Sequence, residues 1–217
     1  MAALAVLVSG GACAGVEPSR VEAPGQWSST AVDLGRGLTA STDAPANSRI
    51  ANVWSADHLR VLVIDGSRLT VKNSNGTVLA EPVQIGSLSE IEWSPDSRGF
   101  VVTESDGGLV GSWSATAYRL TSTGLAARNL GQLVSSEFQK REGACSEIPN
   151  VGASGWLESG ILLVVAEAPP HSSCRDMGAI RGYEVSAIDG KILKRYDEAE
   201  LRARYGHRLG LRFRVTP

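Results

Sequence analysis

The sequence predicts an all-β fold of antiparallel four-stranded meanders, with one short helix near the C-terminus. The first observation is a tryptophan that returns three times, as Trp54, Trp93 and Trp156, each followed seven and nine residues later by an apolar residue. A glycine turn then closes each unit, at 75–76, 123–124 and 189–190. The 217 residues include 24 Gly and only 2 Met, a composition that suits a turn-rich β protein. Repetition of this kind defines an architecture and leaves the function open.

The first 15 residues form a segment of a different kind, in which an apolar run over 2–8 is followed by small residues. The segment resembles the end of a bacterial secretory signal. Cleavage could follow Ala14, or Cys13 could become the lipidated first residue of a lipoprotein. A disordered end or a core strand is the alternative. We expect an exported protein, located in the periplasm, at the outer membrane as a lipoprotein, or outside the cell.

Residues 16–26 contain two prolines and read as a linker, so the folded domain is expected to span 27–217. Residues 27–32 and 38–41 have strand-like composition. Apolar runs and period-two alternation between turn residues predict the strands of the three units. These are 59–64, 68–72 and 77–80 in the first unit, 99–103 and 113–121 in the second, and 160–167, 180–186 and 191–196 in the third.

The end of the chain departs from the repeat. Asp197 followed three residues later by Glu200 predicts a capped helix start, and the helix is expected to end at Tyr205, before Gly206. The alternating stretch from Leu209 to Val215 predicts a final strand that pairs with the N-terminal strands. Together these could form a fourth sheet that closes a ring. The alternative is an open half-ring or a compact sandwich.

The stretch from Trp93 to Thr103 reads Trp-Ser-Pro-Asp-Ser-Arg-Gly-Phe-Val-Val-Thr and resembles the TolB-type, PD40 (WD40-like) class of β-propeller repeats. The stretch from Trp54 to Val63 is similar but lacks the proline. The resemblance implies a small or incomplete β-propeller over 27–217, although a standard propeller has about four to eight blades. The tryptophan is expected to pack between neighbouring sheets, and Asp57 and Asp96 to accept backbone N–H bonds in the turns.

Two insertions single out the third unit, at 134–152 and 168–178. They carry Cys145 and Cys174, which would close a loop of about 30 residues as a disulfide that stabilises by roughly 3 kcal/mol. Two unrelated thiols, or a metal site with His171, are the alternatives; we expect no metal and no cofactor. Insertions in repeat proteins usually share one binding face. The candidate binding residues are therefore His171, Arg175, Asp176 and Trp156.

Composition and motifs restrict the function. With 21 basic and 23 acidic residues the chain lacks the basic excess that binds nucleic acid, and no apolar run reaches the roughly 20 residues of a membrane span. The arginines over 202–214 could bind an anion or form a solvated surface. We expect an exported, non-enzymatic binding or scaffold protein for a protein or glycan of the cell envelope, with membrane contact only through an N-terminal lipid. The alternative is an exported glycan hydrolase or lyase, in which two carboxylates would lie about 5–10 Å apart in a cleft.

Overall fold

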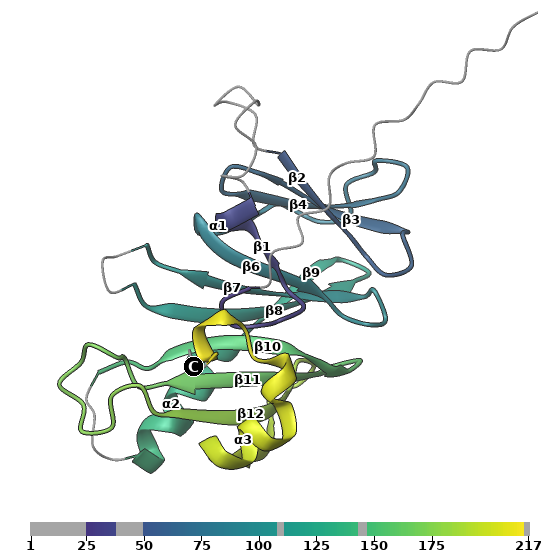
Figure 1. The fold of residues 1–217 in the computed structure, drawn as a ribbon. Helices are drawn as coiled ribbons and strands as arrows, with labels where there is room; N and C mark the ends of the chain where they lie inside the picture. The colour runs from purple at the N-terminus through teal and green to yellow at the C-terminus, as the bar shows by residue number, and fades with distance from the viewer. Residues whose placement is uncertain (1–24, 38–49, 108–110, 143–146, 215–217) are drawn as a thin grey trace, which may run out of the picture.

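The computed structural model describes residues 25–37, 50–107, 111–142 and 147–214 of the chain. These residues form three antiparallel sheets of four, five and four strands, with few helices (Figure 1). The predicted all-β class is therefore confirmed, and none of the sheets in the described residues is closed on itself. No helix in this part of the chain is long and apolar enough to cross a membrane.

The sheets follow one another in chain order, except for β1. The first sheet has the order β2-β3-β4-β5, with the bounds Ile50–Trp54, Arg60–Asp65, Arg68–Asn73 and Val83–Gln84. The second has the order β1-β6-β7-β8-β9, with the bounds Val32–Asp33, Leu88–Trp93, Gly99–Ser105, Trp113–Thr121 and Gly124–Asn129. The third has the order β10-β11-β12-β13, with the bounds Asn150–Glu158, Ile161–Glu167, Ile180–Ser186 and Ile192–Tyr196. The helical elements are α1 (Leu34–Gly37), α2 (Leu130–Glu142), α3 (Glu198–Tyr205) and the 3-10 turns η1 (Gly206–Arg208) and η2 (Leu211–Phe213).

Three apolar cores hold these layers together. The first lies between the first and second sheets, and the second lies among the second sheet, the third sheet and α2. The third core joins the far face of the third sheet to α3 and the end of the chain. Their fully buried side chains include Leu62 and Ile64 in the first core, Leu130 and Leu162 in the second, and Trp27 and Leu201 in the third. The sheets therefore stack in chain order, and α3 covers one end of the stack (Figure 1).

The repeated tryptophans connect successive sheets in the same way. The indole Nε1 of Trp93 donates to the carbonyl of Val53 at 2.9 Å, and that of Trp156 donates to the carbonyl of Glu92 at 3.3 Å. Val53 and Glu92 each come directly before the tryptophan of the preceding unit. Both bonds thus join equivalent positions of adjacent units and satisfy an indole N–H that burial removes from water.

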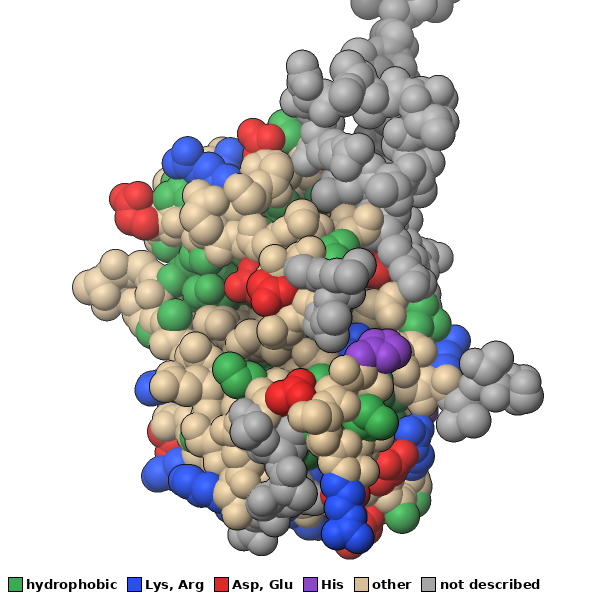
Figure 2. Space-filling model, turned by 90° about the vertical axis from the view of Figure 1, so that its left-hand side faces the viewer, with side chains coloured by type: hydrophobic (Ala, Val, Ile, Leu, Met, Phe, Trp, Pro, Cys, Tyr) green, Lys and Arg blue, Asp and Glu red, His purple; other side chains and the backbone are tan. Residues whose placement is uncertain are grey.

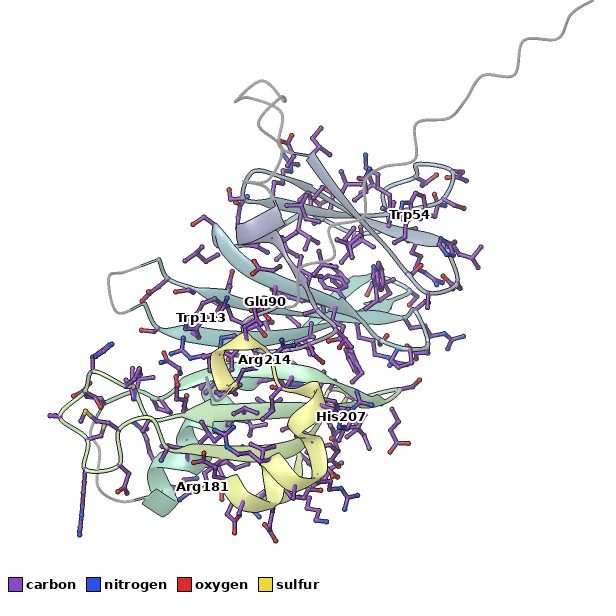
Figure 3. The ribbon with its side chains drawn as sticks, viewed as in Figure 1. Trp54, Glu90, Trp113, Arg181, His207 and Arg214 are labelled. Atoms are coloured by element: carbon purple, nitrogen blue, oxygen red, sulfur yellow. The ribbon has the colours of Figure 1, made fainter. Side chains whose placement is uncertain are left out.

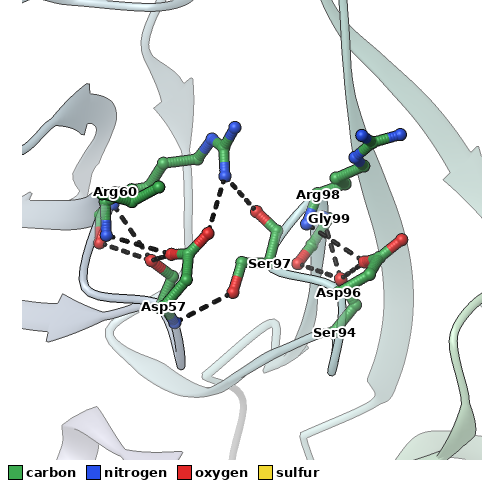
Figure 4. Close-up of polar contacts among 9 residues, drawn as sticks. Asp57, Arg60, Ser94, Asp96, Ser97, Arg98 and Gly99 are labelled. Atoms are coloured by element: carbon green, nitrogen blue, oxygen red, sulfur yellow. Dashed lines mark hydrogen bonds and ion pairs between the residues drawn. The ribbon is translucent and has the colours of Figure 1, made fainter.

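The turn after the tryptophan is also the same in the first two units (Figure 4). The Ser94 hydroxyl accepts the Gly99 amide at 2.9 Å and lies 2.6 Å from Oδ1 of Asp96. In the first unit the Ser55 hydroxyl accepts the Arg60 amide at 3.0 Å and lies 2.7 Å from the carboxylate of Asp57. Each carboxylate also accepts the amide two residues further on. Both aspartates are therefore turn-forming residues, as the sequence predicted.

The two turns touch one another. The Asp57 amide donates to the Ser97 hydroxyl at 3.3 Å, and Arg60 Nη1 lies 3.2 Å both from Asp57 Oδ2 and from the Ser97 carbonyl (Figure 4). The hydrogen bond from Ser55, the Leu59 amide and the charge of Arg60 hold the pKa of Asp57 below its ordinary value. The repeated motif thus stabilises both its own turn and the junction between units.

Helix α2 is not among the predicted elements, since the sequence predicts only an insertion over 134–152. Oδ1 of Asn129 accepts the amide of Gln132 at 2.8 Å, which is a helix N-cap. Leu130, Val134 and Phe138 are buried at a spacing of four residues and pack into the second core. The signals of this helix were therefore present in the sequence.

Three predicted strands are wrong. Of residues 27–32, only Val32 belongs to a strand, β1, and Ser28 makes one isolated bridge to Leu209. Residues 77–80 form no strand, and only Val78 makes an isolated bridge, to Lys72. The stretch from Leu209 contains the 3-10 turn η2, and Val215 lies outside the described residues. The consecutive amides of 210, 211 and 212 all donate to carbonyls of 25–27. A strand cannot do this, because its successive amides point in opposite directions.

The predicted fourth sheet is absent from the described residues. The end of the chain does meet the N-terminal segment, as expected, but only through a bridge between Ser28 and Leu209 and the bonds of η2. Strand β1 instead extends the second sheet, with Val32 opposite Ile91. The second predicted N-terminal strand, 38–41, lies outside the described residues. The predicted C-terminal helix is confirmed as α3, with Asp197 and Glu200 forming the capping box.

Candidate functional site

A cleft of about 310 Å³ opens where the N-terminal segment, the second sheet and the end of the chain meet. Its walls are Gln26, Asp33, Gly35, Leu88, Trp113 and Arg212. Binding sites for small molecules usually begin at about 300 Å³. Figure 3 labels Trp113, which begins β8 of the second sheet. We therefore take this cleft as the candidate site.

The buried carboxylate of Glu90 fixes the N-terminal wall. It accepts the backbone amides of Gln26, Trp27 and Ser28, at 3.1 Å for Trp27 and 3.3 Å for Ser28. A Cβ on Gly25 would lie 2.3 Å from Glu90 Oε2, so the chain can pass this close only as glycine. Burial raises the pKa of Glu90 to about 7, against the opposing effect of the amide bonds. Glu90 is thus a clamp for residues 26–28.

Arg212 is held rigidly in the opposite wall. Its Nε and Nη2 lie 2.8 and 2.5 Å from Oε2 of Glu167, and its guanidinium lies 5.2 Å from the ring centre of Trp27. Asn150 donates to the same oxygen of Glu167 at 3.2 Å. Oδ1 of Asn150 accepts the backbone amide of Trp113 at 3.2 Å. One hydrogen-bond chain therefore links the two sides of the cleft that Arg212 and Trp113 form.

Trp27 packs against two of the residues that line the cleft, Trp113 and Arg212. Its ring is fully buried, 6.0 Å from that of Trp113 and 5.2 Å from that of Phe213. A Cβ on Gly152 would come within 2.0 Å of this ring, so β10 passes against it as glycine. Nε1 of Trp27 is the only buried side-chain N or O in the described residues without a hydrogen-bond partner. The indole of Trp27 therefore contributes through its packing rather than through its donor.

The carboxylates near the cleft do not have the arrangement of a glycosidase pair. Asp33 and Glu90 are direct partners across β1 and β6, and the charge of Asp33 contributes to the raised pKa of Glu90. Glu90 is only 3% exposed and both of its oxygens accept backbone amides. Asp33 Oδ1 accepts the Gly35 amide at 2.9 Å. These bonds hold the carboxylates in structural roles.

The predicted binding residues fall in two different places. His171, Arg175 and Asp176 are exposed in the loop between β11 and β12. Trp156 is 6% exposed and lies opposite Leu162, at the other end of the β10–β11 pair. The structure therefore does not bring Trp156 together with the other three, and Trp156 packs between the second and third sheets.

The two predicted insertions do meet. The amide and hydroxyl of Ser173 donate to Oε1 of Glu147 at 2.8 and 2.9 Å, while Ile148 and Met177 are largely exposed. Cys174 is 5% exposed, whereas Cys145 and Cys13 lie outside the described residues, so disulfide and lipidation stay predictions. Within the described residues no three His, Cys, Asp or Glu side chains are grouped to hold a metal.

The residues of the cleft were missed at the sequence level. Trp27 and Trp113 are the two of the five tryptophans that lie outside the repeat. Their position outside the repeat is the feature of the sequence that could have indicated the cleft. The sequence indicates Arg212 only as one of the arginines over 202–214. Comparisons with protein-family models, with curated proteins and with solved structures found no match for the chain.

Proposed function

We propose that the chain is an exported, non-enzymatic binding protein whose sheets form an incomplete propeller-like stack, and that it binds a protein of the cell envelope. The proposed contact is the outward face of the first sheet, which we name the open face. Its residues are Ile50, Asn52, Trp54, Val61, Val63, Thr70, Lys72 and Val78, which strand pairing places on one side of the sheet.

The equivalence of the units supports this proposal. Trp93 begins a cross-strand row with Phe100 and Tyr118, and that row faces the first sheet. Trp156 begins the corresponding row in the third sheet, which faces the second sheet. In the first sheet the row starts at Trp54 and runs through Val61, Lys72 and Val78. The open face thus corresponds to a surface that a neighbouring sheet buries in the other two units.

Exposure of apolar side chains supports it further. Trp54 is 41% exposed, Ile50 56% and Val78 53%, whereas Trp93 and Trp156 are 9% and 6% exposed. The three exposed side chains of the first sheet share this side of the sheet with Val61, which is 6% exposed. Exposed apolar side chains on one sheet face are typical of interaction surfaces. Figure 1 shows the first sheet at the end of the stack that α3 does not cover.

The two internal interfaces indicate the chemistry of the partner. A suitable partner offers an apolar sheet face and a free backbone carbonyl for the Trp54 indole, as Val53 and Glu92 do within the chain. Burial of the exposed 41% of Trp54, roughly 100 Å² of a side chain of about 250 Å², contributes about 2.5 kcal/mol. Trp54→Ala should therefore weaken the complex by about 70-fold.

Site-specific photo-cross-linking tests this proposal. A photoreactive residue at Asn52, on the open face, is compared with one at Leu193, which is 51% exposed on β13 of the third sheet. We expect the Asn52 probe to capture a distinct envelope protein in intact cells and Trp54→Ala to abolish the capture, whereas the Leu193 probe does not capture it. Cross-links at Asn52 only within the chain, only to a second copy, or unchanged by Trp54→Ala would overturn the proposal.

A further inference from the structure

The geometry points to the cleft at Trp113 and Arg212 as a binding site for a neutral saccharide, separate from the open face. The cleft lies beside the second sheet and the end of the chain, whereas Trp54 lies on the first sheet (Figure 3). The two sites share no residue, so each can be tested without the other.

The apolar part of the cleft suits one face of a sugar ring. Trp113 is partly exposed there, and Leu88, 45% exposed, lies on the same rim. A pyranose has a face of C–H groups that packs on an aromatic ring, and an amphipathic indole offers a large rigid surface for it. A volume of about 310 Å³ is enough for one or two such rings.

The polar part of the cleft suits hydroxyl groups. Arg212 presents only donors and Gln26 presents both donors and acceptors, whereas Asp33, which is 5% exposed, contributes its charge to the wall. Each hydroxyl of a sugar both donates and accepts, so this mixture can pair with neighbouring hydroxyls in either direction.

The charge of the cleft favours a neutral ligand over an anion. The guanidinium of Arg212 is bound to the carboxylate of Glu167 through both Nε and Nη2. Asp33 adds a negative charge to the same wall. The positive charge of Arg212, the cation in this lining, is thus balanced by carboxylates. The cleft therefore has no excess positive charge to attract a phosphate or a carboxylate ligand. On the face drawn in Figure 2, acidic and basic side chains are likewise interspersed.

Buried hydrogen bonds preorganise the residues that line the cleft. Glu167 is 7% exposed and accepts hydrogen bonds from Arg212 and Asn150. Asn150 is 3% exposed and accepts the backbone amide of Trp113. A buried ion pair adds little stability over an apolar pair of the same volume. Locked side chains backed by buried hydrogen bonds are what a specific site requires.

Calorimetric titration of the full chain tests this inference. The probes are gluco-, manno-, malto- and chito-oligosaccharides. Concentrations up to about 10 mM allow dissociation constants in the millimolar range to be measured. Oligogalacturonate and inorganic phosphate are the acidic probes. We expect one neutral series to bind and quench tryptophan fluorescence. Trp113→Ala should weaken that binding at least tenfold and Trp113→Phe should restore part of it. Leu193→Ala, an exposed position on β13 outside the cleft, should leave it unchanged.

Three outcomes would overturn the inference: binding of the acidic probes alone, binding of none, or neutral binding that Trp113→Ala does not weaken. Urea unfolding first establishes that each variant is folded. Should Trp113→Ala fail to fold, Leu88→Asp replaces it, because this exposed rim residue can carry a charge without loss of core packing. The expected result for Leu88→Asp is the same loss of affinity of at least tenfold.

Discussion

The carboxyl group of Glu90 makes the stability of the fold depend on pH in an unusual direction. Burial raises its pKa from an ordinary 4.5 to about 7, although the amides of Trp27, Gln26 and Ser28 oppose the change. Between these two values the folded chain binds more protons at Glu90 than the unfolded chain does. The contribution of Glu90 is therefore most favourable below pH 4.5 and is lost as the pH rises through about 7.

The size of this contribution follows from the two pKa values. One pKa unit corresponds to about 1.4 kcal/mol, so the interval from 4.5 to about 7 corresponds to about 3 kcal/mol. Glu90→Gln removes the titration but keeps the size of the side chain. Its amide NH₂ would face the backbone donors of 26–28, which costs on the order of 1–3 kcal/mol at every pH. The absolute stability of the variant is thus less informative than its pH dependence.

Urea unfolding from pH 4.5 to 8 measures the effect as the difference between wild type and Glu90→Gln. We expect the wild type to lose about 3 kcal/mol relative to the variant between pH 4.5 and 8. Burial also raises the pKa of Glu92, but that group is present in both proteins and cancels. Glu81→Gln, an exposed control, should run parallel to wild type. A difference between wild type and Glu90→Gln that is constant across this range would refute the reasoning. If the variant does not fold, carboxyl carbon NMR on wild type supplies the same test.

Three further predictions concern the framework. Trp93→Phe should destabilise by about 1–2 kcal/mol in urea unfolding, because the carbonyl of Val53 loses its donor, whereas Trp54→Phe should change stability by less than about 0.5 kcal/mol. Ser94→Ala should lower the free energy of unfolding by about 1–3 kcal/mol, since the buried amide of Gly99 loses its acceptor. An unchanged stability would show that this hydrogen bond does not stabilise the turn. If Cys145 and Cys174 form the predicted disulfide, either Cys→Ser variant should lose roughly 3 kcal/mol under oxidising conditions. Two free thiols by mass spectrometry in protein made in an oxidising compartment would contradict that pairing.

The repeat was predictable because its interactions are local. The hydroxyl of Ser94, the carboxylate of Asp96 and the amide of Gly99 lie within six residues of one another, so their spacing in sequence fixes their geometry. Strands β8 and β12 were predicted with their observed bounds for the same reason, because each alternates between clear turns. Helix α2 was missed although its apolar residues recur every four positions, since the neighbouring strands suggested an insertion instead.

Pairing between distant segments was not predictable in this way. Strand β1 contains two residues, and its partner Ile91 lies 59 positions beyond Val32. Nothing in the composition of so short a segment selects the second sheet over a fourth one. The alternation after Leu209 was equally misleading, because Gly210 lies against the backbone of Gln26 and the local geometry follows that contact.

The cleft illustrates the same limit for function. Its walls come from the N-terminal segment, the start of β6, the start of β8 and η2, and no two of these are adjacent in sequence. What joins them is buried: Glu90 clamps the first segment, and Glu167 positions Arg212. In the sequence, both glutamates resemble ordinary polar residues of half-exposed strands. Their burial at 3% and 7% is the observation that identifies them as supports of a site. Burying a carboxylate costs free energy unless it is paired or hydrogen-bonded, and here both carboxylates hold in place groups that line one cleft.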